Sequence, residues 1–299
     1  MKRAVSISLG NPSRNKKVEV NYNGVDISVE RIGTGGDIKA AKDLFTELDG
    51  KVDALSVGGI DCYVTLDGRD YPIYSALKLV ENVHQTPWVD GRHLKYVLEK
   101  RLFELVKPVI GEIPRFKNCF MPFSTDRVGL IEAVSSISDE VIVGDLMFMF
   151  GLPTPIRGLE NFRKTAHALL PIVSYLPLTW LFPPGVGGEE HKPKFEKFWQ
   201  EADLIAGDMH YIGKYAPFDL KGKWVITNTT TAENIQLLRD RGVKKVITTS
   251  PRYDGRSFGI NMMEAVLTAY AGKGRALSRP ELNELVDEVN LRPSVMDLN

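Results

Sequence analysis

The chain has 299 residues, of which 43% are hydrophobic and 25% charged, an ordinary balance for a globular protein. This length suits one large domain or two modest domains, each with its own core. Equal numbers of basic and acidic residues give a net charge of zero, so there is no general electrostatic footprint for nucleic acid. Met1-Lys2-Arg3 leads straight into a strand-like segment, so we expect no signal peptide and a cytoplasmic protein.

The N-terminal third predicts an α/β unit with two hairpins. Asn23-Gly24 and Asp67-Gly68 are strong signals for tight turns between paired strands. Asp37 is the expected N-cap of the first helix. The predicted elements are strands over Ala4–Leu9, Lys17–Tyr22, Val25–Arg31, Val52–Val57, Cys62–Leu66, Arg69–Ile73 and Pro87–Val89, and helices over 38–48, Tyr74–His84 and Gly91–Val106.

The stretch Lys107–Phe116 contains two prolines and a glycine, which favours a linker. We therefore expect an N-terminal α/β domain over residues 1–110, which would hold the substrate and the catalytic groups. Residues 111–299 would form a second, Rossmann-like domain that ends in a helix.

Short apolar runs alternate with helical segments in the second half of the chain. Continuous apolar runs are typical of parallel strands covered by helices on both faces, so we predict a doubly wound α/β sheet. The strands are expected at Asn118–Phe123, Glu140–Val143, Asp203–Ala206, Lys223–Ile226 and Lys244–Ile247, and the helices at Val128–Ile137, Ala232–Arg241 and Ile260–Tyr270, with a last helix capped by Ser278. Ligands of such sheets bind beyond the carboxyl ends of the strands.

The segment from Ala166 to Pro184 is rich in Leu, Trp and Phe, and His167 is its only ionisable residue besides a tyrosine. Four prolines would break a membrane-spanning helix, so we expect a buried, kinked segment or a dimer surface rather than a membrane span. Interfacial membrane contact is the alternative. A homodimer is possible.

The first strand–loop–helix of the second half occupies the position of a dinucleotide fingerprint. Its loop reads Pro122-Phe123-Ser124-Thr125-Asp126-Arg127-Val128-Gly129, so only Gly129 matches a fingerprint glycine. Ser124, Thr125 and Arg127 could donate to an anion. Asp145, at the end of the next strand, is placed to hold an adenosine ribose and favours NAD over NADP. In the alternative interpretation, Thr125 or Asp126 only caps the helix.

Gly207-Asp208-Met209-His210 follows the third strand of the second half. His210 is our candidate for proton transfer, and Asp208 is placed to orient it. Alternatively, Asp208 caps the following turn and His210 lies on the surface. Lys214 and Tyr215 are further candidates.

Two hydroxyl-rich loops follow the last two strands. Asn228, Thr229, Thr230 and Thr231 are expected to contact ribose or substrate hydroxyls, although Thr231 alone could simply cap a helix. Arg252 and Arg256 suit bidentate capture of a substrate carboxylate or phosphate; a charged surface turn is the alternative.

Other polar residues and the two cysteines are weaker candidates for a functional site. Gly58-Gly59-Ile60-Asp61 and Asp90-Gly91-Arg92-His93 are polar strand ends in the N-terminal unit. Cys62 and Cys119 have no metal or redox spacing, so we expect buried thiols in a reducing compartment and no metal.

Four stretches resemble a bacterial family catalogued as quinate 5-dehydrogenase. They are VIVGDLMFMFG (141–151), ADLIAGDMHYI (202–212), VITNTTT (225–231) and VITTSPRYDGRSFGINMMEA (246–265). The resemblance implies an NAD(P)-linked oxidoreductase related to the shikimate/quinate dehydrogenases, with an N-terminal catalytic domain and a C-terminal Rossmann domain. Residues 1–110 do not contain the lysine-bearing motif of those enzymes, so no catalytic lysine is assigned.

The leading hypothesis is an NAD(P)-dependent dehydrogenase that oxidises an alcohol of a small polar, cyclic hydroxy acid. Hydride transfer would belong to the cofactor, and the protein would supply orientation and charge. One alternative is a non-catalytic binding or sensor protein for a small carboxylate or sugar acid. Another is a transferase that uses an adenosine cofactor such as S-adenosylmethionine.

Overall fold

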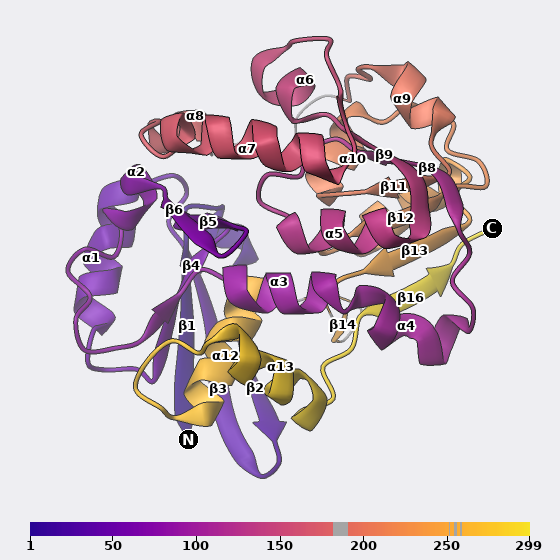
Figure 1. Ribbon diagram of the computed structural model, residues 1–299. Helices are drawn as coiled ribbons and strands as arrows, with labels where there is room; N and C mark the ends of the chain where they lie inside the picture. The colour runs from indigo at the N-terminus through magenta and orange to yellow at the C-terminus, as the bar shows by residue number, and fades with distance from the viewer. Residues whose placement is uncertain (182–190, 251, 254–255, 258) are drawn as a thin grey trace. The chain divides into compact units, whose positions relative to one another are not determined.

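The computed structural model describes residues 1–181, 191–250, 252–253, 256–257 and 259–299 (Figure 1). Contacts divide the chain into two compact units, each built from three segments. Unit 1 comprises Met1–Lys95, Ala168–Gly188 and Gly259–Asn290, and unit 2 comprises Tyr96–His167, Glu189–Phe258 and Leu291–Asn299. The mixed α/β class expected from the sequence is confirmed.

Unit 1 contains a five-stranded sheet with the order β2-β3-β1-β4-β7. Strands β3, β1, β4 and β7 run parallel, and β2 is antiparallel to β3. The elements are β1 (Lys2–Ser8), a 3-10 turn (Pro12–Arg14), β2 (Lys16–Tyr22), β3 (Val25–Gly33), α1 (Ile38–Leu48), β4 (Ala54–Gly58), β5 (Tyr63–Leu66), β6 (Arg69–Pro72), α2 (Tyr74–Leu77), β7 (Trp88–Val89), α3 (Arg92–Lys100, which continues into unit 2), α8 (Leu178–Leu181), α12 (Ile260–Ala271) and α13 (Arg279–Glu288).

Turn and capping residues in the sequence predicted most of these helices and strands correctly. Both expected hairpins form, β2–β3 at Asn23-Gly24 and β5–β6 at Asp67-Gly68. The Asp37 side chain accepts a hydrogen bond from the Ala40 amide and caps α1. The helix predicted over Tyr74–His84 is wrong beyond its first turn, because α2 ends at Leu77.

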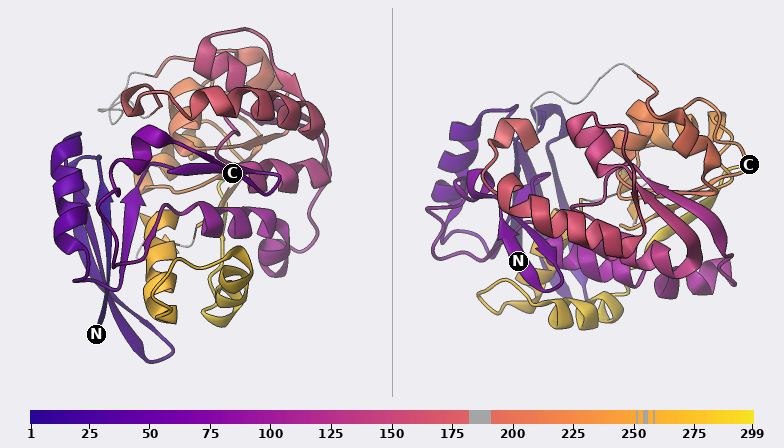
Figure 2. Two further views of the ribbon diagram at one scale, coloured as in Figure 1. Left: turned by 60° about the vertical axis from the view of Figure 1, so that its left-hand side comes forward. Right: turned by 45° about the horizontal axis from the view of Figure 1, so that its top comes forward.

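Two helices from the end of the chain belong to unit 1. Helix α12 packs against β1, β3 and β4, and both views of Figure 2 show it beside these strands. Nine of its twelve residues are buried, which agrees with its largely apolar sequence. Helix α13 begins with the expected Ser278 cap, which forms a reciprocal capping box with Glu281.

Unit 2 contains a seven-stranded sheet with the order β10-β9-β8-β11-β12-β13-β16. The five central strands run parallel, as predicted, and the two edge strands β10 and β16 are antiparallel to their neighbours. The elements are α4 (Leu102–Ile110), β8 (Phe116–Met121), α5 (Val128–Ile137), β9 (Ser138–Val143), α6 (Asp145–Phe150), β10 (Ile156–Arg157), α7 (Leu159–Val173, which continues into unit 1), α9 (Glu196–Glu201), β11 (Leu204–Ala206), α10 (Met209–Tyr215), β12 (Trp224–Thr227), α11 (Ala232–Asp240), β13 (Lys245–Thr248), the hairpin β14 (Arg252–Tyr253) and β15 (Arg256–Ser257), and β16 (Ser294–Asp297).

The stretch predicted as a linker, Lys107–Phe116, includes the last turn of α4 and the first residue of β8. Pro108 lies inside that helix. The division after residue 110 therefore stays a prediction from composition, whereas contacts change from unit 1 to unit 2 at Lys95–Tyr96.

The apolar segment Ala166–Pro184 contains the end of α7 and the short helix α8. Leu170 and Val173 are buried, whereas Ile172, Tyr175 and Trp180 are exposed. Within the ranges given above, no helix is both long enough and apolar enough to span a bilayer.

Candidate functional site

The carboxyl ends of the parallel strands of unit 2 lie at one edge of its sheet. The register pairs Met121 of β8 with Val143 of β9, and Phe120 with Ile205 of β11. Strand β9 follows β8 on one side, whereas β11 lies on the other side, so the winding direction reverses between β8 and β11. Open parallel sheets bind ligands beyond the strand ends at such a switch point.

The loop that follows β8 is held by Asp145. Its carboxylate accepts hydrogen bonds from the amides of Ser124 (3.0 Å) and Thr125 (2.8 Å), and from the Thr125 hydroxyl. Asp145 is 5% exposed and makes no ion pair among the described residues. Three donors thus converge on one buried carboxylate, so in this conformation Asp145 orders the loop. Its ribose-binding role stays a prediction.

Burial raises the pKa of Asp145 from 3.8 to about 6, despite the three hydrogen bonds that lower it. The folded chain therefore holds this proton more tightly than the unfolded chain. The contribution to stability is present below about pH 4 and is lost as the pH rises through 6. In urea unfolding between pH 4 and 7, we expect Asp145→Asn to flatten the pH dependence relative to the wild type; an unchanged slope would contradict this assignment.

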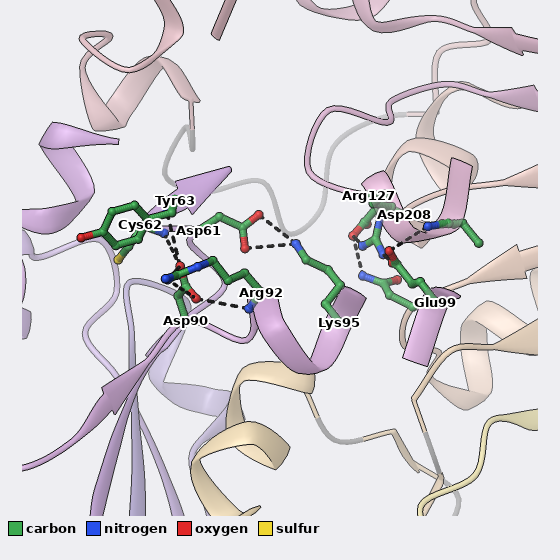
Figure 3. A network of polar contacts seen from close by, with 11 residues as sticks. Asp61, Cys62, Tyr63, Asp90, Arg92, Lys95, Glu99, Arg127 and Asp208 are labelled. Carbon is green, nitrogen blue, oxygen red and sulfur yellow. Dashed lines mark hydrogen bonds and ion pairs between the residues drawn. The ribbon is translucent and has the colours of Figure 1, made fainter. Parts of the chain in front are cut away.

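Arg127 lies at the centre of a buried ion-pair network, drawn in Figure 3. Its guanidinium donates to Glu99 of α3 at 2.7 Å and to Asp208 at 3.1 Å. The side chains of Arg127 and Glu99 are only 4% and 1% exposed. Glu99 also accepts from the Leu130 amide at 3.2 Å, so its carboxylate occupies the N-terminus of α5. That is the position at which a dinucleotide fingerprint holds its pyrophosphate.

Asp208 caps α10, which is the alternative that the sequence left open. One carboxylate oxygen accepts from the His210 amide at 2.8 Å, and the other accepts from Arg127 and from the Asn228 side chain. The His210 ring is exposed, and no hydrogen bond joins it to Asp208, so the expected orienting pair does not form in this conformation. Asp208 nevertheless keeps 34% of its side-chain surface exposed.

The residues of the threonine-rich loop after β12 differ in role and in exposure. Thr231 forms a capping box with Asn234 at the start of α11. Thr230 is buried, whereas Asn228 and Thr229 are partly exposed. The Asn228 side-chain oxygen accepts from the Met209 amide at 3.3 Å, so Asn228 joins the loops after β11 and β12.

Gly129 allows helices α3 and α5 to pack closely. A Cβ at this position would lie 2.8 Å from the Tyr96 carbonyl oxygen and 3.1 Å from the Glu99 Cβ. The glycine therefore lets α3 lie against α5, and this contact brings Glu99 to Arg127. Arg252 and Arg256 lie on the β14–β15 hairpin, but their side chains are outside the described part of the structure.

Sequence reasoning missed Glu99 and, in unit 1, two adjacent ion pairs. Lys95 pairs with Asp61 at 2.9 Å, and Arg92 pairs with Asp90 at 3.3 Å (Figure 3). Only the weak strand-end signals at Asp61 and Asp90 pointed to this region. Both predicted thiols, Cys62 and Cys119, are free and buried, as expected. No cluster of metal-ligating side chains was found among the described residues.

Three solved structures that match the chain are distant from it in sequence. Malic enzyme of Entamoeba histolytica is 9% identical over 97% of this chain and 70% of its own, with a TM-score of 0.38. GanP, a glucose-galactose binding protein from Geobacillus stearothermophilus, is 11% identical over 99% of this chain and 97% of its own, with a TM-score of 0.37. Aspartate transcarbamoylase from Trypanosoma cruzi is 10% identical over 93% of this chain and 83% of its own, with a TM-score of 0.33.

No curated protein matches the chain. Residues 3–90 match the family described as "Domain of unknown function (DUF8753)". The match that covers most of the chain is to "Domain of unknown function (DUF8754)", over residues 93–298. The chain therefore belongs to the DUF8754 family.

Proposed function

We propose that the chain binds a small hydroxyl-rich ligand at the switch point of the unit 2 sheet. The observation that carries this proposal is Asp208, whose carboxylate is fixed by Arg127 and Asn228 yet remains 34% exposed. A hydroxyl group donates to a carboxylate and accepts from a guanidinium or an amide, so a vicinal diol suits this combination. The groups are ordered before binding, which lowers the entropic cost.

The position of the Glu99 carboxylate favours a sugar or sugar acid over a dinucleotide as the ligand. Its buried carboxylate already receives the Leu130 amide at the N-terminus of α5. A pyrophosphate at that helix end would lie close to this negative charge, and the loop lacks the glycines that let phosphate approach the backbone. The non-catalytic binding or sensor protein is therefore our first candidate.

One observation favours the second candidate, an NAD(P)-dependent oxidoreductase acting on a small cyclic hydroxy acid. In chain order, the strands β10-β9-β8-β11-β12-β13 read 3-2-1-4-5-6, which is the order of dinucleotide-binding sheets. Strand β10 departs from that plan because it is antiparallel to β9. A cofactor would have to place its phosphates away from the N-terminus of α5.

Calorimetric titration with ribose, glucose, quinate, NAD and NADP distinguishes the candidates. We expect a sugar or quinate to bind without turnover, and Asp208→Asn to weaken binding at least tenfold, because a hydrogen bond to a charged group contributes about 1.5–3 kcal/mol. Asp240→Asn, an exposed aspartate at the end of α11, is the matched control and should bind as the wild type does.

Circular dichroism establishes that each variant is folded. Binding of NAD or NADP with reduction of the nicotinamide by quinate would support the second candidate instead. Absence of binding by all five compounds, or equal affinity of the Asp208 variant and the wild type, would overturn the proposed site.

A further inference from the structure

The parallel sheet of unit 1 also has a switch point, which is separate from the one in unit 2. Strand β3 lies on one side of β1 and β4 on the other, so the winding reverses between β1 and β4. Ser8, the last residue of β1, is in register with Gly58, the last residue of β4. The loops after these two strands therefore begin side by side, at the kind of position where parallel sheets bind ligands.

A shielded lysine–aspartate pair lies next to this point. Asp61 is three residues beyond β4, and Lys95 projects from the first turns of α3. The Lys95 ammonium is 2.9 and 3.1 Å from the two Asp61 oxygens, and the side chains are only 13% and 17% exposed (Figure 3). The desolvation free energy of two shielded charges is about as large as the free energy gained from their attraction. The pair is therefore expected to add little to the stability of the fold, so another role has to be considered.

The pair is also held rigidly. Asp90, whose side chain is fully buried, accepts hydrogen bonds from the amides of Cys62 (2.9 Å) and Arg92 (3.2 Å). One carboxylate thus ties the loop that carries Asp61 to the start of the helix that carries Lys95. The Arg92 guanidinium lies 4.3 Å from the centre of the Tyr63 ring and braces the same junction. Such bracing fixes charged groups in advance of binding.

The loop that carries Asp61 is open on one side at Gly59. This residue, two positions before Asp61, has a left-handed φ of +73°, and a Cβ built there would meet no heavy atom within 4 Å. The backbone at Gly59 therefore faces open space.

We propose that Lys95 and Asp61 form a second ligand site, which recognises a hydroxyl group of a small neutral polyol. A hydroxyl can accept from the ammonium and donate to the carboxylate at once, so it inserts into the pair without a change in net charge. A ligand carboxylate or phosphate would compete with Asp61 for Lys95 and would be repelled by it. This site is independent of the one at Asp208.

Saturation-transfer NMR with inositol, ribose and glucose at millimolar concentration tests this site. We expect the wild type to bind at least one of the three, and Lys95→Met to weaken that binding at least tenfold. Lys42→Met is the matched control, because Lys42 belongs to the same unit and its pair with Glu81 is exposed, at 35% and 47%. The control should leave binding unchanged. Every variant is compared with its parent in the Asp208→Asn background, so that sugar bound at the site in unit 2 does not contribute to the signal.

Asp61→Asn provides a second variant, which keeps the side-chain shape and should also weaken binding; circular dichroism establishes that both variants fold. Failure of all three compounds to bind would overturn the inference. Equal affinity of the wild type, Lys95→Met and Asp61→Asn would overturn it as well. Binding by the wild type but not by Asp208→Asn would assign the whole signal to unit 2 and contradict a Lys95 site.

Discussion

Replacing Arg127 with methionine is expected to lower the free energy of unfolding by about 3–5 kcal/mol. The substitution removes the positive charge but keeps most of the aliphatic stem. It leaves the Glu99 carboxylate, 1% exposed, in the protein interior without its 2.7 Å partner. It also removes one of the side-chain donors that fix Asp208, the other being Asn228. Urea unfolding followed by circular dichroism measures the change.

Arg115→Met is the matched control, because the pair of Arg115 with Asp139 is 62% and 59% exposed and should contribute less than about 1 kcal/mol. The double variant Glu99→Gln/Arg127→Met should recover part of the loss, since neither charge of this pair then remains buried. Equal losses for Arg115→Met and Arg127→Met would show that burial of the network does not matter.

Gly91→Ala is expected to have the second largest effect, a loss of about 2–5 kcal/mol. Gly91 has φ +93°, a left-handed conformation that costs a residue with a Cβ about 1–2 kcal/mol. The new Cβ would also lie 2.8 Å from the backbone nitrogen and Cα of Asn261, and overpacking of this kind costs about 1–3 kcal/mol more. Because backbone atoms of α12 cannot rotate away, the helix itself would have to shift. Thermal and urea unfolding measure the loss.

Gly68→Ala separates the two contributions. Gly68 has a similar φ of +78°, but a Cβ there would meet nothing within 4 Å, so only the conformational cost should appear. If Gly91→Ala and Gly68→Ala destabilise the chain equally, the close approach of the loop after β7 to α12 contributes nothing.

Elements set by neighbouring residues were predictable from the sequence. Asn23-Gly24 specifies a tight turn, and the Ser278 side chain accepts from the Glu281 amide three residues on. Both signals therefore act over a few neighbouring residues. The five parallel strands of unit 2 were predictable because burial on both faces requires uninterrupted apolar runs. The helix over Tyr74–His84 failed because the backbone after Leu77 continues as turns, in which the amides of Leu79, Val80 and Val83 donate to carbonyls three residues back. Asp49, far back in the chain, then accepts from the amides of His84 and Gln85.

The polar groups at the carboxyl edge of unit 2 were predictable as a set, but their roles were not. Asp145 and Asp208 were identified by position, and the structure shows both accepting backbone amides. Glu99 could not be identified, because it comes from a helix that precedes the sheet and reaches Arg127 only through the close packing at Gly129. Sequence patterns report which residue types follow a strand, whereas pairing depends on contacts between distant segments.

The three-segment construction of unit 1 affects the order in which the chain can fold. Its sheet is packed against α12, whose Asn261 side chain donates to the hydroxyls of Ser6 on β1 and Ser56 on β4. A ribosome releases Ser6 and Ser56 more than two hundred residues before Asn261. The core of unit 1 therefore cannot close until α12 has been synthesised, unlike the core of a domain that folds as it emerges. Until then its nascent strands expose the apolar surface that α12 will cover, and exposed strands of this kind are prone to aggregation.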